Sequence, residues 1–127
     1  MKNLILIRIS ILLFFLTLIS GCYYDEEMIF EGLPSNVSFK NDVSPILTLN
    51  CTTTGCHDAV PAHAPSLVPE KAISDLTSGK YINTLEPEKS AFYQVVKSGE
   101  MPPTSVTVGI NDQKIILAWI TEGAKDN

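Results

Sequence analysis

Four segments of the chain carry apolar residues at the spacing of an amphipathic helix, and the stretches between them are rich in glycine, proline and small polar residues. No stretch shows sustained alternation of apolar and polar residues, so we expect at most one short extended piece, over 105–110. The pattern therefore predicts an all-α domain. The predicted helices span 39–47, 69–76, 86–97 and 112–122.

The predicted helices begin and end at residues that favour helix boundaries. Asn41 is the candidate N-cap of the first helix, with Pro45 in its first turn, and Asn111 is the candidate N-cap of the last. We expect the second helix to start at Pro69 and to stop before Gly79. The apolar positions expected to face the core are Val43, Ile46, Leu47, Ala91, Phe92, Val95, Val96, Ile115, Leu117, Ala118, Trp119 and Ile120.

The first 21 residues have a different pattern. Lys2 and Arg8 are followed by an almost unbroken apolar run over 9–19, which is too short and too close to charge to predict a transmembrane helix. A basic start followed by such a run is typical of a secretory signal. The next residues, Ile19-Ser20-Gly21-Cys22, resemble the bacterial lipobox, whose cysteine becomes the lipidated N-terminus of the mature protein. The alternative is an ordinary signal followed by an unrelated cysteine.

Lipidation of Cys22 implies a protein anchored outside the cytoplasm, either on the periplasmic face of a membrane or at the cell surface. The stretch that follows has four acidic residues, one glycine, one proline and no clear period. We therefore interpret 22–37 as a tether and 38–127 as the domain.

Removal of the signal leaves 106 of the 127 residues, enough for one small domain. The chain has nine basic and fourteen acidic residues, and because Lys2 and Arg8 lie in the signal, the rest carries a net charge of −7. Its seven lysines are scattered singly. The negative net charge disfavours nucleic acid and anionic membrane surfaces as partners and favours basic docking partners. A core this small is often supplemented by a disulfide, a metal or a cofactor.

Two of the three cysteines, Cys51 and Cys56, fall in the predicted domain, and His57 follows directly. In an oxidising compartment such a pair typically forms a disulfide. A zinc site needs four ligands, and His63 is the one evident addition, although it is more simply interpreted as a solvent-facing loop histidine. A cysteine pair that ends in Cys-His is also how c-type haem is attached. The usual loop has two residues between the cysteines; here there are four, and Gly55 allows the longer loop to turn.

From about Phe39 to Lys125 the sequence resembles the small monohaem cytochrome c family. The stretch Ala64-Pro65-Ser66-Leu67 is similar to the Gly-Pro-x-Leu segment of that family, with alanine in place of glycine. The resemblance implies that the carbonyl of Pro65 accepts a hydrogen bond from His57, the proximal iron ligand, and that Leu67 packs on the haem.

A second part of the resemblance lies at Lys97-Ser98-Gly99-Glu100-Met101-Pro102-Pro103. This segment is similar to the one that presents the distal methionine ligand of the family. Met101 lies 44 residues beyond His57, and the two prolines after it prevent a helix from continuing. The resemblance therefore implies that Met101 is the second axial ligand.

Together these similarities imply a small cytochrome c-like helical domain wrapped around one covalently bound haem c. We expect an electron carrier and not an enzyme, which alone or within a larger redox complex meets its redox partner proteins transiently. Its contact with the membrane is expected to run through lipidated Cys22. Two other functions stay open: a non-redox lipoprotein with a Cys51–Cys56 disulfide, and a haem sensor or peroxidase-like module in which Met101 is displaceable.

Overall fold

The structure is a computed structural model that describes Arg8, 32–103 and 107–127. Its contacts divide the chain into two units, Met1–Phe30 and Glu31–Asn127, and all the elements below belong to the second. The predicted signal, Cys22 and the first part of the predicted tether lie outside the described residues, Arg8 apart.

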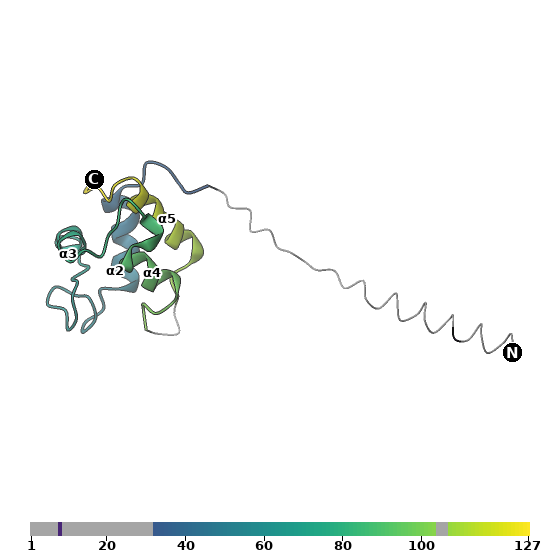
Figure 1. Cartoon of the computed structure of the whole chain (residues 1–127). Helices are drawn as coiled ribbons and strands as arrows, with labels where there is room; N and C mark the ends of the chain where they lie inside the picture. The colour runs from purple at the N-terminus through teal and green to yellow at the C-terminus, as the bar shows by residue number, and fades with distance from the viewer. Residues whose placement is uncertain (1–7, 9–31, 104–106) are drawn as a thin grey trace. The chain divides into compact units, whose positions relative to one another are not determined.

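Helices and connecting loops make up the described part of the chain, with no strand among those residues, and the all-α prediction is confirmed there (Figure 1). In the same residues, no helix combines the length and the apolar character needed to cross a bilayer. The elements are a π-helix η1 (Phe39–Val43), α2 (Ser44–Asn50), α3 (Ala72–Ser78), a 3₁₀ turn η2 (Pro87–Lys89), α4 (Ala91–Lys97) and α5 (Ile110–Thr121).

Both predicted N-caps are wrong. Ser38 caps η1, because its hydroxyl accepts a hydrogen bond from the backbone N–H of Asn41 at 3.2 Å, so Asn41 already lies inside the first turn. At α5 the N-cap is Gly109, without a side-chain cap, and Asn111 is the second helical residue. Of the predicted extended piece over 105–110, residues 107–109 form no strand, although Gly109 has extended backbone angles, Ile110 begins α5, and 104–106 lie outside the described residues.

Two predicted helix boundaries also differ. A turn in which the N–H groups of Lys71 and Ala72 both donate to the carbonyl of Val68 precedes α3, so the helix starts at Ala72 and not at Pro69. The segment predicted as one helix over 86–97 is interrupted at Ser90, which separates η2 from α4.

Ser90 interrupts that segment because its side chain serves another loop. It is 1 % exposed, has an extended ψ of 126°, and its hydroxyl accepts a hydrogen bond from the N–H of Asn83 at 2.9 Å. Serine commonly bonds to nearby backbone in place of continuing a helix. The contact fixes the start of α4 against the loop that precedes η2.

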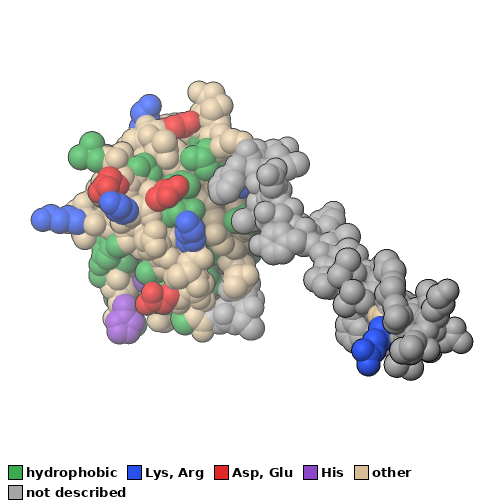
Figure 2. Space-filling view, turned by 45° about the vertical axis from the view of Figure 1, so that its right-hand side comes forward, with side chains coloured by type: hydrophobic (Ala, Val, Ile, Leu, Met, Phe, Trp, Pro, Cys, Tyr) green, Lys and Arg blue, Asp and Glu red, His purple; other side chains and the backbone are tan. Residues whose placement is uncertain are grey.

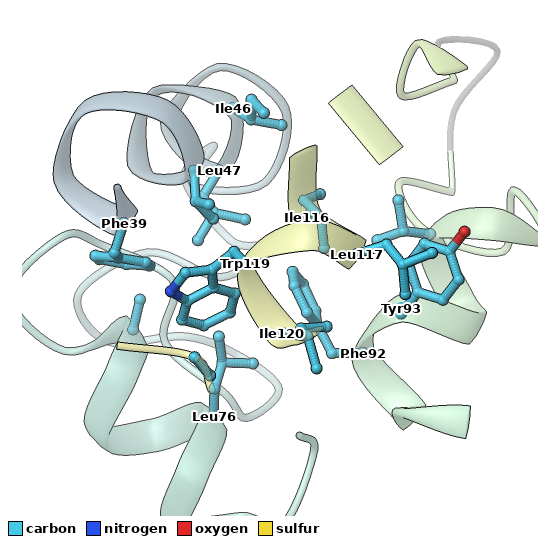
Figure 3. Close-up of a cluster of buried hydrophobic side chains, with 14 of the residues drawn as sticks. Phe39, Ile46, Leu47, Leu76, Phe92, Tyr93, Ile116, Leu117, Trp119 and Ile120 are labelled. Carbon is cyan, nitrogen blue, oxygen red and sulfur yellow. The ribbon is translucent and has the colours of Figure 1, made fainter. Parts of the chain in front are cut away.

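Trp119 on α5 lies at the centre of the core, fully buried as predicted, with Phe39, Leu47 and Leu76 around it (Figure 3). The rings of Phe39 and Trp119 have centroids 5.3 Å apart at an interplanar angle of 41°, a favourable tilted arrangement. The indole N–H donates to the carbonyl of Lys125 at 2.9 Å, so its polar atom is satisfied. Most of the predicted core positions are buried, but Ala91 is exposed and Val95 and Ile115 are half-buried.

The start of the described chain is held to the end of α5. The carboxylate of Glu122 accepts hydrogen bonds from the N–H groups of Asn36 at 2.7 Å and Val37 at 3.0 Å. Asn127 continues this contact, since its side-chain and backbone oxygens accept from the N–H groups of Phe39 and Lys40. The last residues of the predicted tether are therefore fixed to the domain.

We expect Glu122→Ala to lower the free energy of unfolding by about 1–2 kcal/mol, because two amide hydrogen bonds to a carboxylate are lost. The amide protons of Asn36 and Val37 should exchange faster with solvent, as measured by hydrogen exchange, and denaturant unfolding gives the stability. Asp126→Ala, at an exposed position, is the control. Unchanged exchange at both amides would show that the contact does not hold the tether.

Candidate functional site

A cavity of about 590 Å³ opens between the loop that follows α2, helices α3 and α4, and the loop that follows α4. This volume lies within the range of about 300–1,000 Å³ that is usual for small-molecule and cofactor sites. Most of the lining is apolar. The buried side chains of its wall are Leu67, Leu76, Phe92 and Val96.

All six residues predicted to bind a cofactor line this one cavity, although 50 positions separate the first from the last. They are Cys51, Cys56, His57, Pro65, Leu67 and Met101. The fold therefore brings together two thiols, an imidazole and a thioether at an apolar cavity. His63, predicted to face solvent, is exposed and lies at the cavity as well.

The loop between the cysteines folds back on itself. Cys51 follows the last turn of α2, and its carbonyl accepts a hydrogen bond from the N–H of His57 at 3.2 Å, so both ends of the loop are adjacent. Within it, the N–H of Cys56 donates to the carbonyl of Thr53 at 2.8 Å. Gly55 has φ of +83°, which residues with a Cβ rarely adopt, and the space around it is open. A four-residue insert thus forms a closed turn that keeps Cys51 and Cys56 at the cavity.

The imidazole of His57 is oriented by backbone. Its Nδ1 lies 2.7 Å from the carbonyl oxygen of Pro65, the contact expected from the sequence resemblance. Because a carbonyl oxygen only accepts, Nδ1 must carry the proton and donate, which leaves the lone pair of the neutral ring on Nε2. The carbonyl of His57 in turn accepts from the N–H of Leu67 at 2.9 Å. This arrangement prepares Nε2 as a metal ligand.

Met101 reaches the cavity from the loop that follows α4. Its N–H donates to the carbonyl of Val95 at 2.9 Å, and Gly99, with φ of +74°, makes the turn between them. The side chain is half-buried, and Pro102 and Pro103 line the cavity beside it. A methionine held this way at a cavity rim differs from one that fills a gap in a core.

The two cysteines of the loop are free thiols in the structure and differ in their surroundings. Burial, and after it the proximity of Cys56, raises the pKa of Cys51 to about 11. Cys56 is exposed. In the described residues, no cluster of three or more histidine, cysteine or acidic side chains is arranged to hold a metal ion.

We expect iodoacetamide at pH 8 to alkylate Cys56 faster than Cys51 in the haem-free chain, because the thiolate is the reacting species and the raised pKa keeps Cys51 protonated. The raised pKa of Cys51 also means that the free energy of unfolding falls as the pH rises from 9 towards 11. Over this range the thiol ionises in the unfolded chain but stays protonated in the folded one. Peptide mapping by mass spectrometry measures the two rates. Equal rates at pH 8 would contradict the burial of Cys51.

Several wall residues were not singled out as site residues in the sequence. Leu76, Phe92 and Val96 fit equally well as ordinary core positions, and Tyr81 and Leu49 carry no motif. Leu49 is 81 % exposed although apolar and is part of the cavity lining. No sequence signal distinguishes these wall residues, since the exposure of Leu49 and Ala91 is known only from the structure.

Comparison with protein-family profiles, with curated proteins and with solved structures finds no match to this chain.

Proposed function

We propose that this chain is a c-type cytochrome that carries one haem, bound covalently through Cys51 and Cys56, and that its role is electron transfer. The observation that carries the proposal is the convergence of Cys51, Cys56, His57 and Met101 on one apolar cavity. The contact of His57 Nδ1 with the carbonyl of Pro65 supports it, because it leaves Nε2 free to bind iron.

The residues present fit a haem in their chemistry. Two thiols can form thioether links to the two vinyl groups, imidazole and thioether are both established axial ligands, and the apolar wall suits the macrocycle. When bound, haem supplies a one-electron couple. The chain's part is to hold the group through Cys51 and Cys56, to orient the ring of His57, and to exclude water with Leu67 and Phe92.

Electron transfer is favoured over catalysis because His57 and Met101, which line the same cavity, would both bind the iron and would leave no open site for a substrate. His/Met ligation also raises the iron potential relative to ligation by two histidines. We further propose that Cys22 carries lipid and holds the protein to a membrane outside the cytoplasm. Lysines and acids lie interspersed on the face shown in Figure 2, which suits weak, short-lived contacts with redox partners.

The test is the covalency of haem. The full chain, produced with the cytochrome c maturation machinery and then denatured in acid, should keep its haem, and its intact mass should rise by one haem beyond any acylation. A colourless chain, or one that releases its haem into acidified solvent, overturns the proposal. A colourless chain with a Cys51–Cys56 disulfide would instead establish the non-redox lipoprotein.

Replacement of Met101 tests the distal ligand. We expect Met101→Ala to abolish the weak near-infrared band of methionine-ligated ferric haem and to lower the midpoint potential, because the thioether sulfur is lost. His63→Ala is the matched control, since His63 also lines the cavity and carries a side chain that can bind iron, and its replacement should leave the spectrum unchanged. If the band survives in Met101→Ala or disappears in His63→Ala, the assignment of Met101 is wrong.

A further inference from the structure

One peptide group joins the imidazole of His57 to a carboxylate on α3. The carbonyl of the Pro65–Ser66 peptide accepts from His57 Nδ1 at 2.7 Å, and the N–H of the same peptide donates to Asp75 Oδ2 at 2.9 Å. The hydrogen-bonded series thus runs from the carboxylate through a single amide to the ring. It crosses from α3 to the loop that lines the cavity.

The loop around this peptide is fixed. Ser66 is 2 % exposed, and its hydroxyl donates to the carbonyl of Asp58 at 2.7 Å. The carboxylate of Asp58 accepts from the N–H groups of Gly55 and Val60, both at 3.0 Å. The peptide therefore has little freedom to turn away from either Asp75 or His57.

Among the described residues, no lysine or arginine forms an ion pair with the carboxylate of Asp75. Lys71, one turn earlier, directs its ammonium to the carbonyl of Ala59 at 2.9 Å. Within 32–103 and 107–127 the one ion pair is that of Lys89 and Glu86, in a different part of the chain. In this part of the chain, the carboxylate of Asp75 therefore accepts from the N–H of Ser66 without an ion-pair partner.

We propose that Asp75 is a positioning residue that acts on His57 through the Pro65–Ser66 peptide, and that it increases electron donation from the imidazole to bound iron. A carboxylate on the N–H of an amide polarises the group and makes its carbonyl oxygen a stronger acceptor. A stronger acceptor pulls the Nδ1 proton and makes the ring a more basic ligand, which stabilises ferric over ferrous iron. Asp75 thus lowers the potential of the site, and this inference rests on the proposed haem function.

The test is Asp75→Asn in the haem-loaded full chain. Asparagine can still accept a hydrogen bond from Ser66 but carries no charge. We expect the midpoint potential to shift to a more positive value, and the proton of His57 Nδ1 in the ferrous protein to move upfield in the NMR spectrum, because its hydrogen bond weakens. A role limited to holding the loop would change neither quantity in this variant.

Two variants control for other causes. Glu70→Gln removes the same charge from an exposed position on the adjacent turn, and Ser66→Ala removes the hydroxyl bond to Asp58 while keeping the N–H that Asp75 contacts. Both should leave the Nδ1 proton in place and change the potential less than Asp75→Asn does. The proposal is overturned if Asp75→Asn shifts the potential no more than Glu70→Gln, or leaves the Nδ1 proton unmoved.

This outcome is separate from that of the haem proposal. If the chain takes up no haem, the proposed function fails, and the Nδ1 proton of His57 can still be observed in the full chain without haem. If Asp75→Asn does not move this proton upfield in the chain without haem, the link between Asp75 and His57 is overturned by itself.

Discussion

The double variant Cys51→Ala, Cys56→Ala is expected to contain no covalently attached haem, a complete loss relative to the unaltered chain. Among the described residues of the cavity wall, these two thiols are the groups that can form thioethers, and both belong to the turn closed by the bond between His57 and Cys51. Haem stain of denatured protein and intact mass measure the loss. Each single variant should keep the haem through one link at a lower yield.

Cys22→Ala is the matched control, because it removes the remaining cysteine of the chain. With all variants expressed behind the same cleavable leader, it should keep a full complement of haem. Covalent haem in the double variant would contradict the assignment of Cys51 and Cys56, and loss of haem in Cys22→Ala would do so equally.

Trp119→Ala is expected to cost about 3–5 kcal/mol in the free energy of unfolding, the usual range for removal of a large aromatic from a core. Trp119 is 0 % exposed and packs on Phe39, and its indole N–H satisfies the carbonyl of Lys125. The variant therefore loses packing and leaves that carbonyl without its donor. Denaturant unfolding of the matured protein measures the change.

Leu85→Ala is the control for this experiment, because Leu85 is equally apolar but 93 % exposed, and its replacement should change stability by less than about 0.5 kcal/mol. A loss below about 1 kcal/mol in Trp119→Ala would show that η1 and α5 do not depend on this contact.

The helical class and the centre of the core could be predicted from the sequence because both follow from local periodicity. Ala118 and Trp119 follow Ile115 at the three- and four-residue spacing of a helical stripe, in a segment long enough to show the repeat, and both are buried as predicted. The break at Ser90 could not be predicted, since it depends on the backbone of Asn83 in a separate loop. The N-caps were wrong for a related reason: Ser38 and Asn41 are both good caps in isolation.

Some residues of the candidate site could likewise be predicted from the sequence, and others could not. Motifs indicated Cys51, Cys56, His57 and Met101, and the fold places them at one cavity. The wall that α4 contributes carries no motif, because apolar residues that line a cavity look the same in sequence as those that fill a core. The contact between Asp75 and Ser66 could not be predicted either, because the two residues are nine positions apart and meet only through the turn before α3.

The bonds from Asn36 and Val37 to Glu122 also limit how far the domain can lie from a lipid attached at Cys22. With Cys22 as the proposed anchor, fourteen residues lie between it and Val37, and a fully extended chain over that stretch spans about 50 Å. Under the proposed function, the domain could meet partners only within that distance of its point of attachment. Loss of the bonds to Glu122 would move the first fixed residue from Asn36 to Ser38, and so enlarge the volume in which partners could be met.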